Sequence, residues 1–452
     1  MSENTESTPN PAQAPGAWIG NALDGTGPWT LRSRIPYLLG VIMLFDSWDS
    51  IVIAFTLPVL IGEWELSSLQ IGSLISAGYG GQFIGALLFG VVAERFGRLP
   101  ILRLLVLIMS LLALACAMAG SYDNLLIIRA VQGVAIGGAL PVSICYINEI
   151  APTETRGKFF GTYQFLLTSG FGIASLTSAW VVPAFGWQPM FALGAIPLLF
   201  LPFTLSLPES PRWLAGKGKT EAVASSLEKL GSGPLPPAND RTAPTAIAEK
   251  IPVAELFSPA IRKTTLLTAC LWFLTSLVSF GLVTWIPSIY VDEFNIPVED
   301  SLRYSAIVAV AVFILPIILR QTIDTLGRRP LPILGTIVGG ISLIAMIFIN
   351  HDATLLLVTL VIIGQIGISI SSMVLWPYTA ETFPTRIRSL ALGTYSSIAR
   401  AASMLTPLLV GGILQVRGSI TPVFLVFGLA ALGAACIWLF GTRETAGRKM
   451  AD

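Results

Sequence analysis

Charged residues are scarce in this chain, making up 12% of its 452 residues, whereas hydrophobic residues make up 54%. A soluble protein of this length normally carries about twice that share of charge. The mean hydropathy is +0.75, and the apolar residues gather in runs of roughly 18–25, the length that a helix needs to cross a bilayer. The scarcity of charge excludes a soluble protein and indicates an integral membrane protein.

Histidine, closely spaced cysteines and an excess of either charge are also lacking. The single histidine, His351, stands beside Asp352 in a short polar break, so we do not expect a histidine proton relay. The four cysteines are scattered through apolar spans without metal-ligand or redox spacing, which indicates free thiols. Because the 27 basic and 26 acidic residues nearly cancel, nucleic acid is not an expected partner. The sequence contains no nucleophile–base or metal-ligand constellation, so we expect neither an enzyme nor a metal or other cofactor.

The predicted fold is an all-α membrane protein with twelve transmembrane helices in two six-helix bundles. Residues 1–35 are polar at their start and are expected to form a disordered cytoplasmic tail. The other boundaries are 36–207 for the N-terminal bundle, 208–262 for a linker, 263–441 for the C-terminal bundle and 442–452 for a second tail. Within the linker, KTEAVASSLEKL is expected to form a short surface helix. The twelve spans are 36–61, 69–93, 100–119, 124–148, 158–182, 187–207, 263–290, 303–323, 331–350, 354–378, 390–415 and 420–441.

The distribution of basic residues predicts the orientation. One set of loops, together with the tails and the linker, holds all but four of the 27 Lys and Arg residues. Of those four, Arg303 and Arg417 lie in the opposite loops, while Arg129 and Arg400 lie within spans. Because basic loops stay in the cytoplasm, both termini and the linker are expected to be cytoplasmic. The expected location is a bacterial inner (plasma) membrane.

Two motifs recur in the second half at nearly the same offset. GVVAERFGRLP (90–100) and DTLGRRP (324–330) both contain an acid followed by x-x-Gly-Arg, offset by 230 residues. EIAPTETRG (149–157) and ETFPTRIRS (381–389) both read Glu-x-x-Pro-x-x-x-Arg, offset by 232 residues. The matched offsets predict that the bundles are repeats related by pseudo-two-fold symmetry. Parallel repeats of six helices are typical of secondary transporters, whose substrate site lies between the halves near the bilayer midplane.

Two aspartates, Asp46 and Asp49, stand in the first span, where each costs at least about 2.5–3.5 kcal/mol near a helix centre. Their spacing puts them on one helix face within reach of each other. Two carboxylates so close in a low-dielectric site cannot easily both ionise, so one is expected to hold a proton. The competing interpretation is that they reach cytoplasmic water, but Asp46 is about ten residues inside its span.

Two arginines also lie at membrane depth. Arg129, near the outer end of the fourth span, can stabilise a nearby carboxylate or donate to a bound anion. An interfacial anchor is the competing interpretation of Arg129. Arg400 lies about ten residues inside the eleventh span, with no acid nearby in that helix. Its planar fork suits a carboxylate substrate, which it can hold through two hydrogen bonds.

Aromatic and amide side chains are expected to complete a substrate cavity. Aromatic rings would stack on an aromatic substrate, and amides would bind its ring hydroxyls. An interfacial anchor is the competing interpretation for these residues, except for Trp48, which lies between the two aspartates, and the similarly deep Trp376. The candidates are Trp48, Tyr79, Gln82, Gln164, Trp285, Trp376 and Tyr378.

The chain resembles the major facilitator superfamily over essentially its whole helical length. The resemblance rests on GVVAERFGR (90–98), RAVQG (129–133), PESPRWL (208–214) and ETAG (444–447) taken together. PESPRWL points to the branch shared by sugar porters, organic-ion carriers and aromatic-acid/proton symporters. Within it, DSWD (46–49) resembles the Asp-Gly-x-Asp signature of the aromatic-acid symporters, with Ser47 in place of the glycine.

This resemblance implies roles for the loop motifs and for one arginine. In the superfamily the loop charges form a cytoplasmic latch that is made when the carrier faces outward and broken when it turns inward. The arginine that matches Arg129 is implicated in proton coupling. The competing interpretation of the loop charges is that they only fix the topology. The expected latch residues are Glu94, Arg95 and Arg98, their copies Asp324, Arg328 and Arg329, and the pairs Glu149–Arg156 and Glu381–Arg388.

The sequence thus predicts a proton-coupled symporter that imports a small organic acid, with an aromatic carboxylate favoured, by alternating access. Its expected partners are this substrate, protons and the lipid bilayer, and we expect a monomer. Two alternatives in the same superfamily stay open: a carrier of sugars or other organic solutes, and a multidrug/proton antiporter. Against them, the seventh span lacks the paired glutamines of sugar porters, and the fifth lacks the Gly-Pro break of multidrug exporters.

Overall fold

The structure, a computed structural model, describes residues 17–25, 31–152, 155–232, 235, 252–349, 353–384 and 386–445. Within these ranges the chain forms helices joined by short loops, and no strand occurs. Eleven of the described helices are long and apolar enough to cross a membrane. The protein is therefore a multi-pass membrane protein, as its hydropathy predicts.

The long helices divide into an N-terminal and a C-terminal half. The N-terminal half contains α2 (Leu31–Trp64), α3 (Ser68–Phe96), α4 (Arg98–Ala117), α5 (Tyr122–Ile150) and α6 (Arg156–Phe185). The C-terminal half contains α11 (Arg262–Asp292), α12 (Val298–Leu326), α13 (Pro330–Ala345), α14 (Thr354–Thr382), α15 (Arg388–Arg417) and α16 (Thr421–Cys436). Short helical extensions follow α13 at Met346–Phe348 and α16 at Ile437–Gly441.

The sixth expected span is divided into two helices, α7 (Gln188–Leu193) and α8 (Pro197–Thr204). The segment Gln188–Thr204 is apolar but shorter than the other spans. Proline at the start of α8 has no backbone N–H to continue a helical ladder, although it fits the first turn of a new helix. With this segment, each half has six spans, which confirms the predicted two six-helix bundles.

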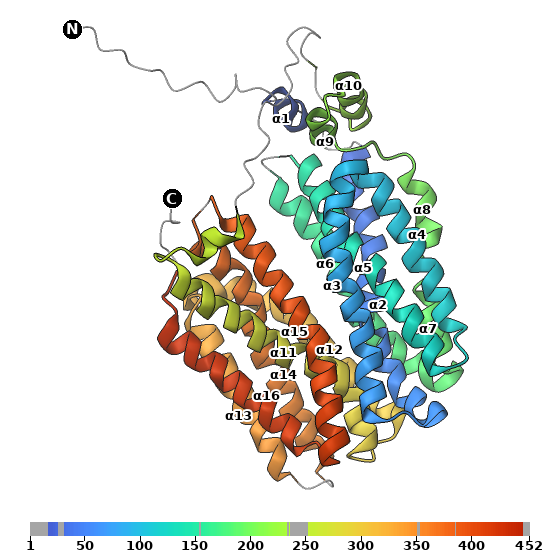
Figure 1. The fold of residues 1–452 in the computed structure, drawn as a ribbon, viewed down its shortest axis with the longest axis vertical. Helices are drawn as coiled ribbons and strands as arrows, with labels where there is room; N and C mark the ends of the chain where they lie inside the picture. The colour runs from blue at the N-terminus through green and yellow to red at the C-terminus, as the bar shows by residue number, and fades with distance from the viewer. Residues whose placement is uncertain are drawn as a thin grey trace, which may run out of the picture.

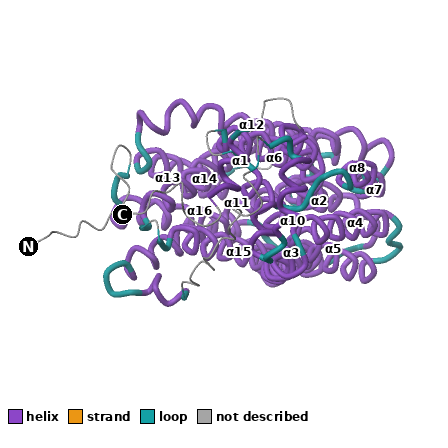
Figure 2. The backbone as a smooth tube through the Cα atoms, turned by 90° about the horizontal axis from the view of Figure 1, so that it is seen from above, coloured by secondary structure: helices purple, strands orange, loops and turns teal. Residues whose placement is uncertain are grey.

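The two halves contact each other through matching pairs of helices. α3 packs against α15, and α6 packs against α12. Figure 2 shows the first pair at one edge of the interface and the second pair at the other edge. Each pair joins helices that would exchange under the pseudo-two-fold relation, as the repeated motifs predict. A third contact, between α2 and α11, lies between them.

The halves are in close contact at the end of the molecule opposite the linker, here called the far end. Ser76 Oγ donates to the carbonyl of Met404 at 2.7 Å, joining α3 to α15. Nearby, Gly72 allows the backbones of α3 and α15 to lie close together, because a Cβ at Gly72 would lie only 2.4 Å from the carbonyl oxygen of Pro407. Toward the linker end the two sets of ribbons diverge (Figure 1).

Short helices cover the linker end of the N-terminal half: α1 (Ala17–Asp24), α9 (Pro211–Gly216) and α10 (Thr220–Lys229), seen at the top of Figure 1. A further turn, Val253–Phe257, precedes α11. Helix α10 lies within KTEAVASSLEKL, the part of the linker in which a short helix was expected. Helix α1 corrects the prediction of a wholly disordered tail, because Ile19 and Leu23 are buried in the same apolar cluster as Leu214 and Leu227.

Candidate functional site

A cavity of about 850 Å³ lies between the two halves. Its walls come from α2, α3 and α6 of the N-terminal half and from α11, α12 and α14 of the C-terminal half. It reaches Phe160, only four residues from the linker end of α6, and Pro287, near the far end of α11. The cavity therefore extends from the closed far end toward the linker end. Its aromatic lining consists of Phe55, Tyr79, Phe160, Phe165, Phe171, Phe280, Phe313 and Trp376.

Three of the expected substrate residues line this cavity: Tyr79, Gln164 and Trp376. The ring of Tyr79 meets that of Phe280 edge-on across the interface, with centroids 5.5 Å apart, and its hydroxyl donates to the carbonyl of Ser50. Trp376 packs edge-on against Trp272 at 4.9 Å. These contacts fix the orientation of both rings at the cavity wall.

The other aromatic and amide candidates are not among the residues that line the cavity. Trp48 turns into its own half, where its indole N–H donates to the carbonyl of Met190 at 2.9 Å. Gln82 donates to Ser50 Oγ at 3.2 Å. Trp285 is 2% exposed, and Tyr378 is 3% exposed with its ring against Trp438. Their position in the sequence did not reveal the direction in which each side chain points.

The two aspartates of α2 are buried, and neither is among the residues that line the cavity. Asp49 is fully buried and neither of its carboxylate oxygens has a hydrogen-bond partner. A Cβ at Gly194 would lie 2.4 Å from Asp49 Oδ1, so the break between α7 and α8 packs directly against this carboxylate. Asp46 is 5% exposed, and its Oδ1 also lacks a partner. A charged carboxylate buried in this way is costly unless a cation or a proton compensates it.

Each aspartate has one arginine within electrostatic range. Asp49 interacts with Arg129, which is 2% exposed and donates to Gln132 Oε1 at 2.9 Å. Asp46 interacts with Arg400, which comes from α15 in the other half. Sequence reasoning found no acid for Arg400 because it considered only neighbours within the same helix. Each aspartate thus faces its own arginine, one within the N-terminal half and one across the interface, and the two carboxylates also interact electrostatically with each other.

Charged pairs repeat at the linker end of each half. In the N-terminal half, Arg98 pairs with Glu149 at 3.2 Å. The Glu209 carboxylate accepts hydrogen bonds from the backbone N–H groups of Leu99 and Ser210, next to Gly97 with φ of +111°. Burial raises the pKa of Glu209, although the hydrogen bonds oppose this shift. A Cβ at Gly97 would lie 2.6 Å from this carboxylate, so glycine is required there.

The C-terminal half contains the copy of this arrangement. Arg328 pairs with Glu381 at 3.1 Å. The Glu444 carboxylate accepts from the backbone N–H groups of Arg328 and Arg329, beside Gly327 with φ of +96°. Sequence reasoning used PESPRWL and ETAG only as family markers and missed the acids Glu209 and Glu444. The signal was available, because both motifs place a glutamate just after the last span of their half.

The remaining latch candidates make other contacts. Glu149 pairs with Arg98 rather than with Arg156, whose Nε has no partner. Arg95 lies over the ring of Phe96, and Glu94 is exposed. The carboxylate of Glu381 likewise pairs with Arg328, and Arg388 lies at the start of α15. The side chain of Asp324 is outside the described part of the structure, in which the ion pairs at the linker end each join residues of one half or its adjoining linker.

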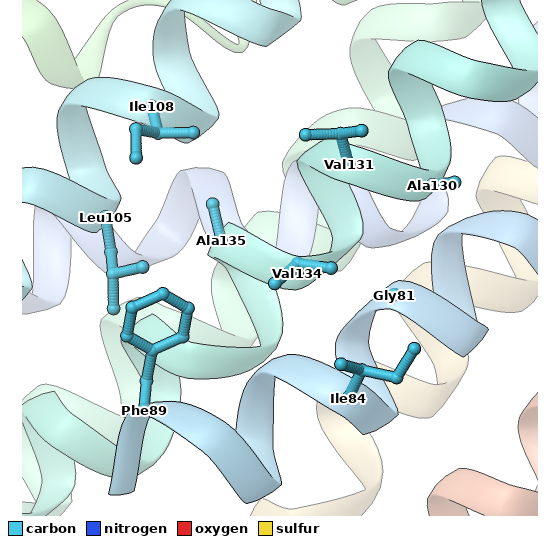
Figure 3. A pocket seen from close by; sticks show the side chains of 9 residues that line it. All are labelled: Gly81, Ile84, Phe89, Leu105, Ile108, Ala130, Val131, Val134 and Ala135. Carbon is cyan, nitrogen blue, oxygen red and sulfur yellow. The ribbon is translucent and has the colours of Figure 1, made fainter. Parts of the chain in front are cut away.

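A second cavity, of about 370 Å³, lies on the side of the N-terminal half between α3, α4 and α5. Figure 3 shows its apolar lining, with Phe89 and Leu105 at one end and Gly81 with Ile84 at the other. Because Ile84 and Val131 are largely exposed on the outside of the helices, this hollow faces the lipid side. Its lining offers no polar group to a substrate.

Two similar six-helix halves, a cavity between them and matched charge pairs at one end define a secondary transporter of the major facilitator type. Residues 35–452 match the family described as "Sugar (and other) transporter", and the chain belongs to that family. Its transmembrane helices and transport class are thus established on sequence and fold together.

Curated relatives cover almost the whole chain. The chain is 27% identical over 423 residues to the niacin transporter NiaP of Acinetobacter baylyi, covering 92% of this chain and 94% of that protein. It is 28% identical over 421 residues to a gallate transporter of Pseudomonas putida, covering 92% of each. Among solved structures, a D-xylose-proton symporter superposes with a TM-score of 0.74 at 21% identity, covering 92% of this chain and 99% of the other. The last likeness shows the fold alone.

Proposed function

We propose that this protein is a proton-coupled symporter that imports a small aromatic carboxylate across a bacterial inner membrane. The observation that carries the proposal is the cavity between the halves, whose mainly apolar walls include eight aromatic side chains, together with two buried aspartates on α2, one of the helices that form the wall. Niacin and gallate, transported by two similar proteins, are both carboxylic acids on a single aromatic ring. The linker end is the cytoplasmic side in this proposal, so the structure corresponds to an inward-facing state.

The aromatic walls favour a flat ring as the substrate. Tyr79 and Phe280 come from opposite halves, and Trp376 adds a third ring toward the linker end. Stacked or edge-on contacts between rings contribute about 0.5–1.5 kcal/mol beyond the burial of their area. A sugar, by contrast, needs many hydrogen bonds, and most of this lining is apolar.

Arg400 is the group we assign to the substrate carboxylate. It stands on α15 within electrostatic range of Asp46, and in the described part of the chain it forms no direct ion pair. Protonation of Asp46 would remove the charge that competes for Arg400, and the guanidinium could then hold the substrate through two hydrogen bonds. Binding of a proton to Asp46 would therefore precede and favour binding of the substrate carboxylate to Arg400.

Asp49 is the second group, after Asp46, that we assign to proton carriage. Its carboxylate faces Arg129, and it lies against Gly194 in the broken sixth span. When the halves rock, the access of water to this site changes sides, and the proton can be taken up on one side and released on the other. The charge pairs at the linker end would join the two halves in the outward-facing state.

Uptake in proteoliposomes tests the proposal. A labelled aromatic acid such as nicotinate or gallate should accumulate when the outside is made acidic, and this accumulation should be lost in Asp49→Asn. Exchange of substrate across the membrane without a pH gradient should persist in the same variant, because exchange needs no net proton movement. Accumulation that survives in both Asp49→Asn and Asp46→Asn would refute the proton assignment. Competition by neutral sugars but not by aromatic acids would refute the substrate class.

A further inference from the structure

One buried acceptor beside the cavity has no role in the structure as it stands. Gln365 lies on α14 among the lining residues and is 2% exposed. Its Nε2 donates to Ser369 Oγ at 3.3 Å, while its Oε1 has no hydrogen-bond partner. Among the described cavity-lining residues, this is the one with a buried side-chain polar atom left without a partner. An unpaired buried acceptor destabilises the folded protein, so its retention calls for an explanation.

Gln365 belongs to a polar stripe on one face of α14. Gln365, Ser369 and Ser372 are spaced four and three residues apart, and all three line the cavity. Such spacing places side chains on one helix face. Across the cavity stands the amide of Gln164 on α6. Within the described part of the chain, the side chains of Ser372 and Gln164 have no protein hydrogen-bond partner, so both are open to a ligand.

The polar stripe changes the kind of ring that the cavity favours. Aromatic walls alone would take any single-ring acid, whether or not its ring carries substituents. A buried carbonyl oxygen without a partner instead favours a ligand that brings a donor to it. A ligand with an apolar substituent at that position would leave the acceptor unpaired and would therefore bind with lower affinity.

We propose that Gln365 determines specificity by accepting a hydrogen bond from a hydroxyl group on the substrate ring. The preferred substrates are then ring-hydroxylated aromatic acids rather than unsubstituted ones. This inference rests on the proposed function, since it presupposes an aromatic acid in the cavity. The orphaned acceptor of Gln365 acquires its partner when the substrate binds, and the neighbouring hydroxyl of Ser372 is available to a second ring hydroxyl.

A matched series of competitors tests the inference on the purified protein in proteoliposomes. Benzoate, 4-hydroxybenzoate, 3,4,5-trihydroxybenzoate and 4-methoxybenzoate differ in donors, and the methoxy compound keeps the oxygen while losing the donor. In the wild type, the hydroxylated acids should compete roughly ten-fold or more better than benzoate and the methoxy compound, the fold-change for one satisfied buried acceptor. Gln365→Met keeps the length of the side chain and removes the acceptor. In this variant the hydroxylated acids should compete about as well as benzoate, so the ratio of the two competition strengths should fall to about one.

Gln415→Met is the matched control, since Gln415 is exposed on α15 and does not line the cavity. Gln365→Asn is a second variant in case the methionine disturbs packing, and its shorter reach should also lower the ratio. A ratio that stays near its wild-type value in both Gln365 variants, or a wild type without preference for hydroxyl groups, overturns the inference. If no aromatic acid in the series competes at all, it is the proposed function that fails.

Discussion

Substituting Gly72 by alanine should open the far end of the molecule. A Cβ at this position would lie 2.4 Å from the carbonyl oxygen of Pro407, whereas ordinary contacts of this kind begin at 3.4 Å. The difference, 3.4 minus 2.4, requires α3 and α15 to separate by about 1 Å. Forcing extra volume into a packed contact typically costs about 1–3 kcal/mol. Because this contact closes the far end, that cost should shift the population toward far-end-open states by roughly 5- to 150-fold.

Distances between spin labels measure this shift. Labels at Leu69 on α3 and Val416 on α15 occupy exposed sites at the far end, in a background without the four native cysteines. Gly412→Ala is the matched control, since a Cβ there meets nothing within 4 Å. Gly72→Ala should lengthen and broaden the label distance, while the control keeps it. If both variants give the wild-type distribution, the close approach at Gly72 does not hold the far end closed.

Two further predictions concern the linker end. Because burial raises the pKa of Glu209 above its ordinary value of 4.5, the folded protein holds this proton more tightly than the unfolded chain does. The free energy of unfolding should therefore decrease as pH rises above 4.5 through the folded pKa, and Glu209→Gln should flatten that slope in a series of melting curves. Arg98→Gln should lower the free energy of unfolding by about 1–3 kcal/mol, because it breaks a half-buried ion pair with Glu149. Arg156→Gln should lower the free energy of unfolding clearly less in the same melting assay. Equal decreases in the two variants would contradict the observed pairing of Arg98 with Glu149.

Much of the fold was predictable because it depends on local properties of the sequence. Apolar runs fix the spans, and the repeated loop motifs fix the relation between the halves. The break at Gly194–Ile196 was missed because the mean hydropathy of the segment stays high across it, although Pro197 at the start of α8 was a visible signal. The burial of Ile19 and Leu23 was missed because they belong to a helix of only eight residues near the end of a tail that is polar at its start.

The site was less predictable than the fold, because residue type does not fix the direction of a side chain. Trp48 stands between two candidate aspartates in the sequence, yet it points into its own half toward Met190. Gln365 was overlooked although a signal existed, namely the spacing of Gln365, Ser369 and Ser372 on one face of the helix. The partner of Arg400 lies in another helix of the other half, and no spacing in the sequence encodes such a contact.

The two linker-end clusters show in physical terms why the spacing of the loop motifs recurs in both halves. In each half a positive-φ glycine begins a tight turn, and a distant glutamate fills the space where a side chain would have stood. That glutamate caps the next helix, and the arginine that follows the glycine reaches the acid of the second motif. The glycine, the arginine that follows it and the two glutamates of each cluster therefore depend on partners supplied by other motifs of the same half. A cluster built from three separate segments keeps its spacing in both copies because the loss of one segment would leave buried charges in the others unpaired.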